Sequence, residues 1–413
     1  MLELAEHSDV VFTGKVTEVG GDSATVMVEE VLAGKPAGPA VTVSPIYLLQ
    51  CTGSSRNFAV NERVLLLGKT AGADRMTLAV GDQGKIALTA ETEARELAAA
   101  RRLLEVARLE NHEKNFAMMS LVRSENETLR REARRYVASA ISPAKMDDRF
   151  KNELVALMGD ADPEIQTVGL AGMRFVKAPE AIPRMVELAR SENFSVLSDV
   201  SLALGQYDTA ESAAALIALT QHANPEIRRR ACLDLRASRR PEAKVALIKL
   251  LSDRDPQVCA LGPVGLVDWL RDDQTGEALP RLVELLDDPE PAVRASAAEQ
   301  LGECRNSALV PPLLEALKKT PSEESVKRGI LVALYCHYSK GDAQAKELID
   351  ASLAPIVAAL KAGGPHDGYG PSFQAVGILD LSPKTEAREA LEWAVQSHPN
   401  RDIQEYAKRS LEK

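Results

Sequence analysis

The chain has 413 residues, of which 45% are hydrophobic and 27% are charged, as is typical of folded globular proteins. Because single hydrophobic cores stop growing beyond about 250–300 residues, we expect more than one structural unit. The net charge is −10, and acidic residues outnumber basic ones both before and after residue 89. This balance argues against nucleic acid as a partner, which needs a basic surface. The sequence contains no apolar run of about 18 residues, so it predicts no transmembrane segment.

Up to about residue 89 the apolar residues recur with a period of two, and Gly, Pro, Asn and Asp fill the gaps. The predicted strands are Val10–Val19, Ala24–Val31, Val41–Val43, Arg63–Leu67, Met76–Val80 and Lys85–Leu88. Five or six short strands within residues 1–89 predict a small closed β-barrel, which leaves no exposed sheet edge. A continuous amphipathic run over 91–109 then predicts a helix, at 90–110, that links this barrel to the rest of the chain.

Internal repetition dominates the remainder, 111–413. A large apolar anchor residue follows a turn, and in most units a small residue stands four positions later, as in Ile227 and Ala231. The nine anchors are Leu129, Ile165, Val196, Ile227, Val258, Val293, Val326, Phe373 and Ile403. The turns before several anchors pair an N-cap residue with a proline at the first helical position, as in Asp255-Pro256. Each unit therefore predicts two helices that bury their apolar faces only by stacking on neighbouring units.

The segment from Leu279 to Ala297 reads Leu-Pro-Arg-Leu-Val-Glu-Leu-Leu-Asp-Asp-Pro-Glu-Pro-Ala-Val-Arg-Ala-Ser-Ala. It resembles the HEAT repeat, especially the short bacterial variety that is similar to phycobilin-lyase repeats. The resemblance covers about nine units and implies an α-solenoid. Such solenoids generally bind other macromolecules, and a minority act as lyases on bilin chromophores.

The first 89 residues resemble bacterial netrin-like domains in three segments: Ser8–Val16, Val28–Gly34 and Asn61–Leu66. This resemblance implies an OB-type barrel shared with the tissue inhibitors of metalloproteinases, and export from the cytoplasm. Because these domains usually begin with Cys-x-Cys after a signal peptide, we expect the given sequence to start inside the mature protein. Cys51 is then one half of a disulfide whose partner lies upstream, or else a lone buried cysteine. Residue 1 is Met, which disfavours the zinc chelation by which those inhibitors act.

The sequence offers no recognisable catalytic or cofactor site. The six histidines lack metal-ligand spacing, and no nucleophile elbow, zinc-protease, P-loop or dinucleotide motif is present. No cysteine belongs to a CxxC pair, so a zinc site is not expected. The sequence thus predicts a non-enzymatic protein without cofactor or metal.

Three groups of residues are candidates for contact with a partner. Arg229, Arg230 and Arg236 lie in a second helix without an evident structural task. By contrast, Arg130, Arg228, Arg294 and Lys327 stand just after anchors, where HEAT-like stacks form a ladder with turn acids. The alternative for the three arginines is a solvated ridge paired with nearby Glu and Asp. The second group is Tyr335, His337 and Tyr338 at a helix end, and the alternative is that they fill a gap left by irregular stacking. The third group is His366 and Tyr369 in a glycine-rich segment where the anchor spacing increases to 47 residues, which we expect to be a mobile loop that contacts the partner. For this segment, the alternative is a plain insertion between helices.

The sequence therefore predicts a multidomain fold, with an OB-like β-barrel at 1–89 and an α-solenoid of HEAT-like repeats at 111–413. We expect a protein-binding scaffold that holds a protein or peptide, in the periplasm or outside the cell, with a cytoplasmic location as the alternative. Two other functions stay open: a bilin lyase-like enzyme, and a structural envelope or assembly component.

Overall fold

The computed structural model describes residues 1–20, 23–36, 38–44, 58–71, 75–78, 85–139, 148–271, 278–304, 306–320, 322–340, 343–367 and 369–412. Cys51 and the end of the fifth predicted strand, Ala79 and Val80, lie outside these ranges. The chain divides into two compact units, Met1–Ala178 and Pro179–Lys413. The first unit holds the β-barrel and the first helices, and the second holds the remaining helical repeats.

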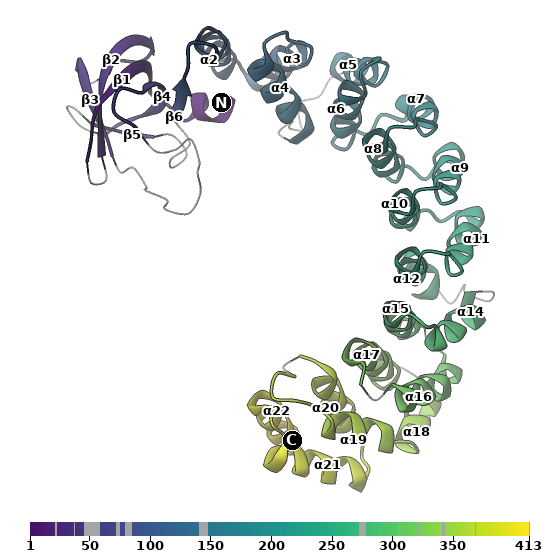
Figure 1. The fold of residues 1–413 in the computed structure, drawn as a ribbon. Coiled ribbons are helices and arrows are strands. Elements are labelled where there is room, and N and C mark those ends of the chain that lie inside the picture. Colours follow the sequence, from purple (N-terminus) through teal and green to yellow (C-terminus); the bar gives the residue numbers. More distant parts are fainter. Residues whose placement is uncertain are drawn as a thin grey trace. The chain divides into compact units, whose positions relative to one another are not determined.

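Six strands form the sheet of the first unit, and each coincides with a predicted strand (Figure 1). They are β1 (Val10–Gly20), β2 (Ser23–Ala33), β3 (Ala40–Val43), β4 (Arg63–Thr70), β5 (Arg75–Leu78) and β6 (Lys85–Leu88). The order β1-β2-β3-β5-β4 closes on itself because β4 also pairs with β1, while β6 adds to β4. Strands β3 and β5 are parallel, and the other pairs are antiparallel. The result is a small five-stranded barrel of OB-like strand order, as predicted.

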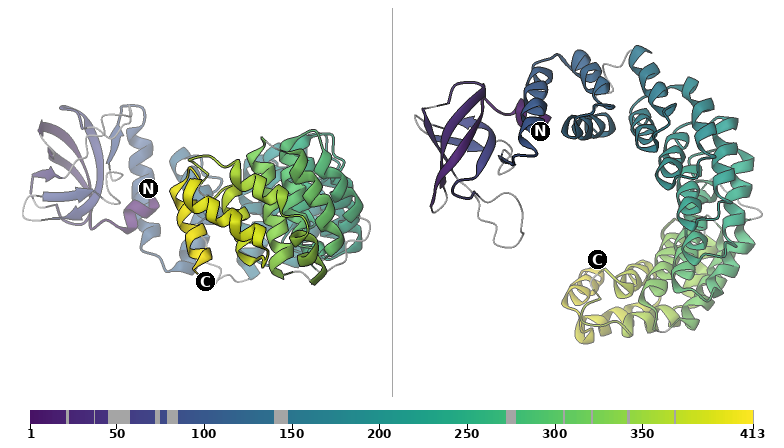
Figure 2. Two further views of the ribbon diagram at one scale, coloured as in Figure 1. Left: turned by 90° about the horizontal axis from the view of Figure 1, so that it is seen from below. Right: turned by 45° about the horizontal axis from the view of Figure 1, so that its top comes forward.

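Strands β1 and β4 are buried on both faces. The side chains of Phe12 and Leu66 point into the barrel, whereas those of Val11, Leu65 and Leu67 belong to a second apolar cluster outside it. Helices α1 (Leu2–Glu6) and α2 (Glu93–Ala107) cover this outer cluster, for example with Leu4, Ala100 and Leu104 (Figure 2). In a strand that is covered on both faces, side chains at successive positions are buried. This explains why the apolar residues of β4 form a continuous run. The predicted linking helix is present as α2, and it is also part of the barrel's packing.

Two helix pairs complete the first unit: α3 (Asn111–Ser120) with α4 (Glu127–Ser139), and α5 (Asp148–Met158) with α6 (Pro163–Met173). The predicted small residue in the second helix is Gly169, which contacts α5 directly. A Cβ atom added to Gly169 would lie 2.8 Å from the carbonyl oxygen of Leu154. A real Cβ does not approach backbone so closely, so the glycine sets the spacing of these two helices.

The second unit continues the alternation of helices. Its helices are α7 (Ile182–Leu188), α8 (Phe194–Leu204), α9 (Ala210–Leu219), α10 (Pro225–Leu235), α11 (Pro241–Leu250), α12 (Pro256–Gly265), α13 (Val267–Arg271), α14 (Ala278–Glu284), α15 (Pro291–Leu301), α16 (Val310–Lys319), α17 (Glu324–Lys340), α18 (Ala343–Asp350), α19 (Ala354–Lys361), α20 (Pro371–Leu381), α21 (Thr385–Ser397) and α22 (Arg401–Leu411). Short 3-10 turns precede α7 and α16 and follow α14.

The helices of the second unit form two rows. We call α8, α10, α12, α15, α17, α20 and α22 the second-helix row; α7, α9, α11, α14, α16, α19 and α21 form the first-helix row. Successive helices of the second-helix row pack against one another more closely than those of the other row. This unit bends toward the second-helix row, which lies on the inside of the curve in Figure 1. Proteins of this architecture generally bind partners on such extended concave surfaces.

All nine anchors start a second helix, and eight of them are buried. The predicted caps are also present, since the side chains of Asp162, Asn224 and Asp255 each accept a hydrogen bond from the backbone two residues later. The exception among the anchors is Phe373, which is only partly buried.

The longer spacing between the anchors Val326 and Phe373 has two causes. Helix α17 is 17 residues long, and the additional helix α18 follows it before the next pair begins. The glycine-rich segment between α19 and α20 therefore supplies only part of the extra length.

Candidate protein-binding surface

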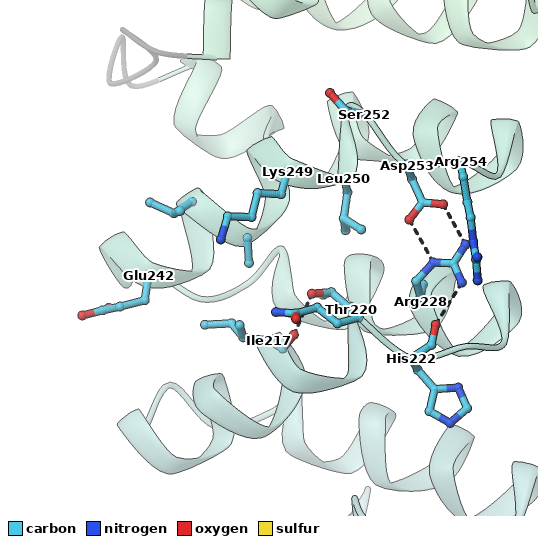
Figure 3. A pocket seen from close by; sticks show the side chains of 13 residues that line it. Ile217, Thr220, His222, Arg228, Glu242, Lys249, Leu250, Ser252, Asp253 and Arg254 are labelled. Carbon is cyan, nitrogen blue, oxygen red and sulfur yellow. Dashed lines mark hydrogen bonds and ion pairs between the residues drawn. The ribbon is translucent and has the colours of Figure 1, made fainter.

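An arginine ladder joins successive helix pairs. The Nη2 and Nε atoms of Arg228 donate to the two carboxylate oxygens of Asp253, at 2.7 and 2.9 Å, and its Nη1 donates to the carbonyl oxygens of His222 and Ala223 (Figure 3). Arg294 likewise donates to carbonyl oxygens of its own turn and to Glu323 of the next. Both arginines thus tie their own turn to the turn of the next pair. The structural role predicted for this position is confirmed for Arg228 and Arg294. Arg130 donates to the carbonyl oxygens of Ser124 and Glu125 in its own turn, and among the described residues no carboxylate partner is recorded for Lys327.

A groove of about 570 Å³ lies beside Arg228, between α9 and α11. Its walls include Ile217, Val245 and Leu250, and Lys249 and Glu242 border it (Figure 3). Arg228 lies at one end of this groove, and Asp253 already neutralises its guanidinium group. The guanidinium is therefore not an unpaired charge in the groove.

Two of the three candidate arginines, Arg229 and Arg230, lie in α10, and Arg236 directly follows it. Each has an acidic neighbour. Arg229 pairs with Glu226 at 2.8 Å, and Arg230 pairs with Asp234 at 2.9 Å. The nearest recorded carboxylate of Arg236 is that of Asp268, at 3.9 Å. The alternative that these side chains pair with nearby acids is therefore confirmed for Arg229 and Arg230.

Asp234 itself is nearly covered and accepts hydrogen bonds from Ser201 and Arg230. Burial raises the pKa of Asp234 above its ordinary value, although both hydrogen bonds work in the opposite direction. This carboxylate serves the packing of α8 against α10, because Ser201 belongs to α8.

Four aromatic side chains gather at the C-terminal end of the second-helix row. The rings of Tyr369 and Phe373 are 5.1 Å apart, and those of Phe373 and Tyr406 are 4.7 Å apart. Gly377 lies between Tyr335 and Tyr406, since a Cβ there would be 3.3 Å from the ring of Tyr335 and 3.4 Å from the hydroxyl of Tyr406. We call Tyr335, Tyr369, Phe373 and Tyr406 the aromatic surface. They come from α17, the turn before α20, α20 itself and α22.

The aromatic surface is open to solvent. Tyr369 is 83% exposed and Tyr335 is 37% exposed, while Phe373 and Tyr406 are partly buried. Aromatic residues make up only 4% of this chain, so four of them in one place is a marked concentration. Aromatic side chains, tyrosine in particular, are enriched in protein interfaces.

The turn that carries Tyr369 is held by buried polar groups. Asp367 accepts a hydrogen bond from the backbone N–H of Ser372, and Asn400 donates to the carbonyl oxygen of Pro365 at 2.9 Å. His398 is fully buried, 3.2 Å from the hydroxyl of Ser372, and burial lowers the pKa of its imidazole. These contacts connect Pro365 and Asp367, which precede Tyr369, to Asn400 and Ser372.

The remaining candidate residues differ in their surroundings. His337 is 2% exposed and its Nε2 lies 3.1 Å from the carbonyl oxygen of Leu301. Tyr338 is 4% exposed, and its hydroxyl donates to Asp350, which together with burial raises its pKa to about 12. Both side chains are thus part of the helix packing and lie outside the aromatic surface. His366 is exposed in the same turn as Tyr369.

Sequence reasoning did not single out Phe373 or Tyr406 as surface residues. Phe373 stands at an anchor position, where the other eight residues are aliphatic, and this difference was the available signal. Tyr406 carries no local signal, because it joins the surface only through the packing of α22 on α20.

Within the ranges that the structure describes, no three His, Cys, Asp or Glu side chains come together as a metal site. Similarly, none of the described helices is long and apolar enough to span a membrane.

Comparison with known proteins finds HEAT repeats in part of the helical region. Residues 266–356 match the family model of HEAT repeats. No curated protein matches the chain. Among solved structures, an engineered protein shares 20% identity with a TM-score of 0.44, covering 78% of this chain and 95% of its own.

A second solved structure supports the fold. It is a chain from the structure that describes Kap95p binding to RanGDP, with 10% identity and a TM-score of 0.56. The alignment covers 76% of this chain and 49% of that chain. The protein is therefore one that combines a small N-terminal β-barrel with a helical solenoid-like region that contains HEAT repeats.

Proposed function

We propose that this chain is a non-enzymatic scaffold that binds a protein segment on the second-helix row, with the aromatic surface as its main contact. Solenoids of HEAT repeats often bind proteins, and the extended concave side is the usual place. The partner's identity is not part of this proposal. The netrin-like and bilin lyase-like resemblances stay sequence-based predictions.

The single observation that carries the proposal is the exposure of Tyr369 beside Phe373, at the C-terminal end of the second-helix row. Phe373 is in turn in contact with Tyr406, so an exposed ring lies next to partly buried ones. Exposed aromatic side chains with partly buried neighbours are typical of residues that contribute most to binding energy.

The candidate arginines contribute less in this proposal. Arg229 already pairs with Glu226, and an exposed ion pair of this kind is worth at most about 1 kcal/mol. Arg230 already pairs with the nearly covered carboxylate of Asp234. They would influence the rate of association with an acidic partner more than its final affinity.

A site-specific photo-crosslinker tests the proposal in the native cell. We would place p-benzoylphenylalanine at position 369 and, as a matched control, at the exposed position Glu389 of α21 in the first-helix row. We expect a discrete cross-linked protein from position 369 that position 389 does not give. We also expect the double variant Tyr335→Ala, Tyr406→Ala to lower the yield of the cross-link from position 369 at least about tenfold. This corresponds to a loss of about 1.4 kcal/mol in binding free energy from the two side chains together.

Two results contradict the proposal. One is an identical cross-linked product from positions 369 and 389, which would mean that contact is unspecific. The other is a full yield from the Tyr335→Ala, Tyr406→Ala double variant with unchanged thermal stability. Cross-links only between copies of this chain would point instead to the structural assembly component.

A further inference from the structure

A second groove, of about 520 Å³, lies between α16 and α19 in the first-helix row. Its walls are mostly apolar, and its described lining residues are Leu317, Lys318, Thr320, Lys327, Ala354, Pro355, Ala358, Ala359 and Ala362. No acidic residue is among them. The volume falls within the range of about 300–1,000 Å³ that is usual for pockets of small molecules.

Lys327 is the notable member of this lining. It occupies the ladder position just after the anchor Val326, as Arg228 follows Ile227 and Arg294 follows Val293. Lys327 is only 7% exposed as a whole residue, and its side chain borders the groove. Among the described residues, however, no side chain or carbonyl is recorded as a partner of its Nζ atom, in contrast to the two arginines.

The partner is missing because the turn after α19 has no acid at the corresponding place. Asp253, which neutralises Arg228, stands three residues after the last residue of α11. Glu323, which neutralises Arg294, stands four residues after the last residue of α16. Three residues after the end of α19 is Gly364. A charge that is buried without a partner is costly, and a bound anion would remove that cost.

The two grooves of this unit can be compared directly. Each lies between neighbouring first helices and includes the ladder cation and a threonine near the end of the preceding helix, Thr220 in one and Thr320 in the other. In the groove beside Arg228 an aspartate of the chain fills the anion position. In the groove beside Lys327 that position is available to a ligand.

We propose that the groove between α16 and α19 binds an aliphatic monocarboxylate, with the carboxylate at Lys327 and the hydrocarbon chain along Ala354, Ala358 and Ala362. The charge of Lys327 selects a single anionic group. The alanine and proline wall offers apolar contact, and each methylene that it covers contributes up to about 0.8 kcal/mol. This site lies on the first-helix row and is separate from the aromatic surface.

A peptide is a poorer occupant of the groove than an aliphatic chain. Its buried backbone N–H and C=O groups would need hydrogen-bond partners. In the wall formed by α19, the carbonyl oxygen of Ala358 already accepts a hydrogen bond from the N–H of Ala362. The hydroxyl of Thr320 already donates to the carbonyl oxygen of Ala316 at 3.0 Å. An alkyl chain makes no such demand.

Isothermal titration calorimetry of the full chain with decanoate, below its micelle concentration, tests this site. We expect saturable binding with one site per chain. Lys327→Met, which keeps the length of the side chain and removes the charge, should weaken decanoate binding at least about tenfold. Decan-1-ol, which keeps the alkyl chain and lacks the charge, should bind the unaltered protein at least about tenfold more weakly than decanoate does.

Three further variants separate the site from unspecific effects. Ala358→Leu fills the groove and leaves Lys327 intact, so it should also abolish most of the binding. Gly364→Asp adds an acid at the place where the other turns have one, and a Cβ there meets no atom within 4 Å. Because the new carboxylate would pair with Lys327 in place of the ligand, we expect weaker decanoate binding together with a higher melting temperature. Lys319→Met is the matched control, because Lys319 is half exposed, pairs with Asp287 and is not among the residues that line the groove. Its loss should change affinity less than about threefold.

The proposal is overturned if folded Lys327→Met binds decanoate as well as the unaltered protein does, or if Ala358→Leu has no effect. It is also overturned if decan-1-ol binds as tightly as decanoate, or if the acetylated peptide Ala-Ala-Leu with a free carboxyl terminus binds more tightly. Tyr369→Ala should leave decanoate binding unchanged, which keeps this test independent of the protein-binding proposal.

Discussion

Arg228 and Asp253 belong to consecutive helix pairs and face each other through two parallel hydrogen bonds, with side chains only 5% and 10% exposed. Burial alone would raise the pKa of Asp253. The hydrogen bonds from Arg228 and from the backbone N–H of Asp255 outweigh burial and place the pKa below its ordinary value. Replacing Asp253 with Asn would leave the guanidinium buried without its charge partner, and we expect a loss of about 3 kcal/mol in unfolding free energy at pH 7.

The same pair predicts a dependence on pH. Because the pKa of Asp253 is lowered by folding, its contribution is complete above the unfolded value and is lost as the pH falls through the folded value. Urea unfolding at several pH values should therefore show the unaltered protein and Asp253→Asn converging in strongly acidic solution. A constant difference in unfolding free energy between pH 7 and pH 3 would contradict this prediction.

The helix caps give a matched comparison. The side chain of Asn224 accepts a hydrogen bond from the N–H of Glu226 at 2.9 Å, whereas the side chain of Glu290 caps nothing at the equivalent position. Asn224→Ala should cost about 1 kcal/mol in unfolding free energy. Glu290→Ala should stay within about 0.5 kcal/mol of the unaltered protein. Equal urea midpoints for the two variants would show that the cap is not a source of stability.

The contact of Gly169 with α5 predicts whether the substitution Gly169→Ala raises or lowers the stability of the protein. Alanine favours helices over glycine by about 1 kcal/mol, but the added Cβ would be 2.8 Å from backbone atoms of Leu154 and Met158. Overpacking of this kind costs about 1–3 kcal/mol, so we expect Gly169→Ala to lower the melting temperature. Gly364→Ala, where a Cβ meets nothing within 4 Å, should not lower it.

The thiols of the second unit should differ in reactivity. Burial, with smaller contributions from Asp234 and Asp253, raises the pKa of Cys232 to about 12, and burial raises that of Cys259 to about 11. The thiolate is the reactive form, so iodoacetamide at pH 8 should leave both unmodified in the folded protein. Cys336 is only partly buried and should react before them. Peptide mass spectrometry over time measures the order, which should disappear in urea.

The repeats could be predicted from the sequence because their signals are local. An anchor residue, a small residue four positions later and a capped proline turn lie within about ten residues of each other, as in Asn224 to Ala231. The six strands were found for the same reason, through the alternation of apolar residues and the turns between them.

The aromatic surface could be predicted only in part. Tyr335 is a candidate because aromatic residues are scarce in this chain, and Tyr369 is one because it lies where the anchor spacing is longest. His337 and Tyr338 are candidates on the same grounds as Tyr335, and only the packing of α17 against its neighbours reveals that both are buried. Their positions depend on which face of a long helix meets the next pair, and the repeat spacing is irregular at this point. The unpaired state of Lys327 likewise depends on contacts between residues that are distant in sequence.

The outer apolar cluster of the barrel determines where the protein can be truncated. Leu65, Leu67 and Val11 lie outside the barrel and are covered by residues of α2, such as Ala100 and Leu104. A fragment that stops at residue 89 would present these side chains to water and would tend to aggregate. A fragment that stops at Ala178 retains the whole compact unit and is the better choice for expressing the barrel on its own.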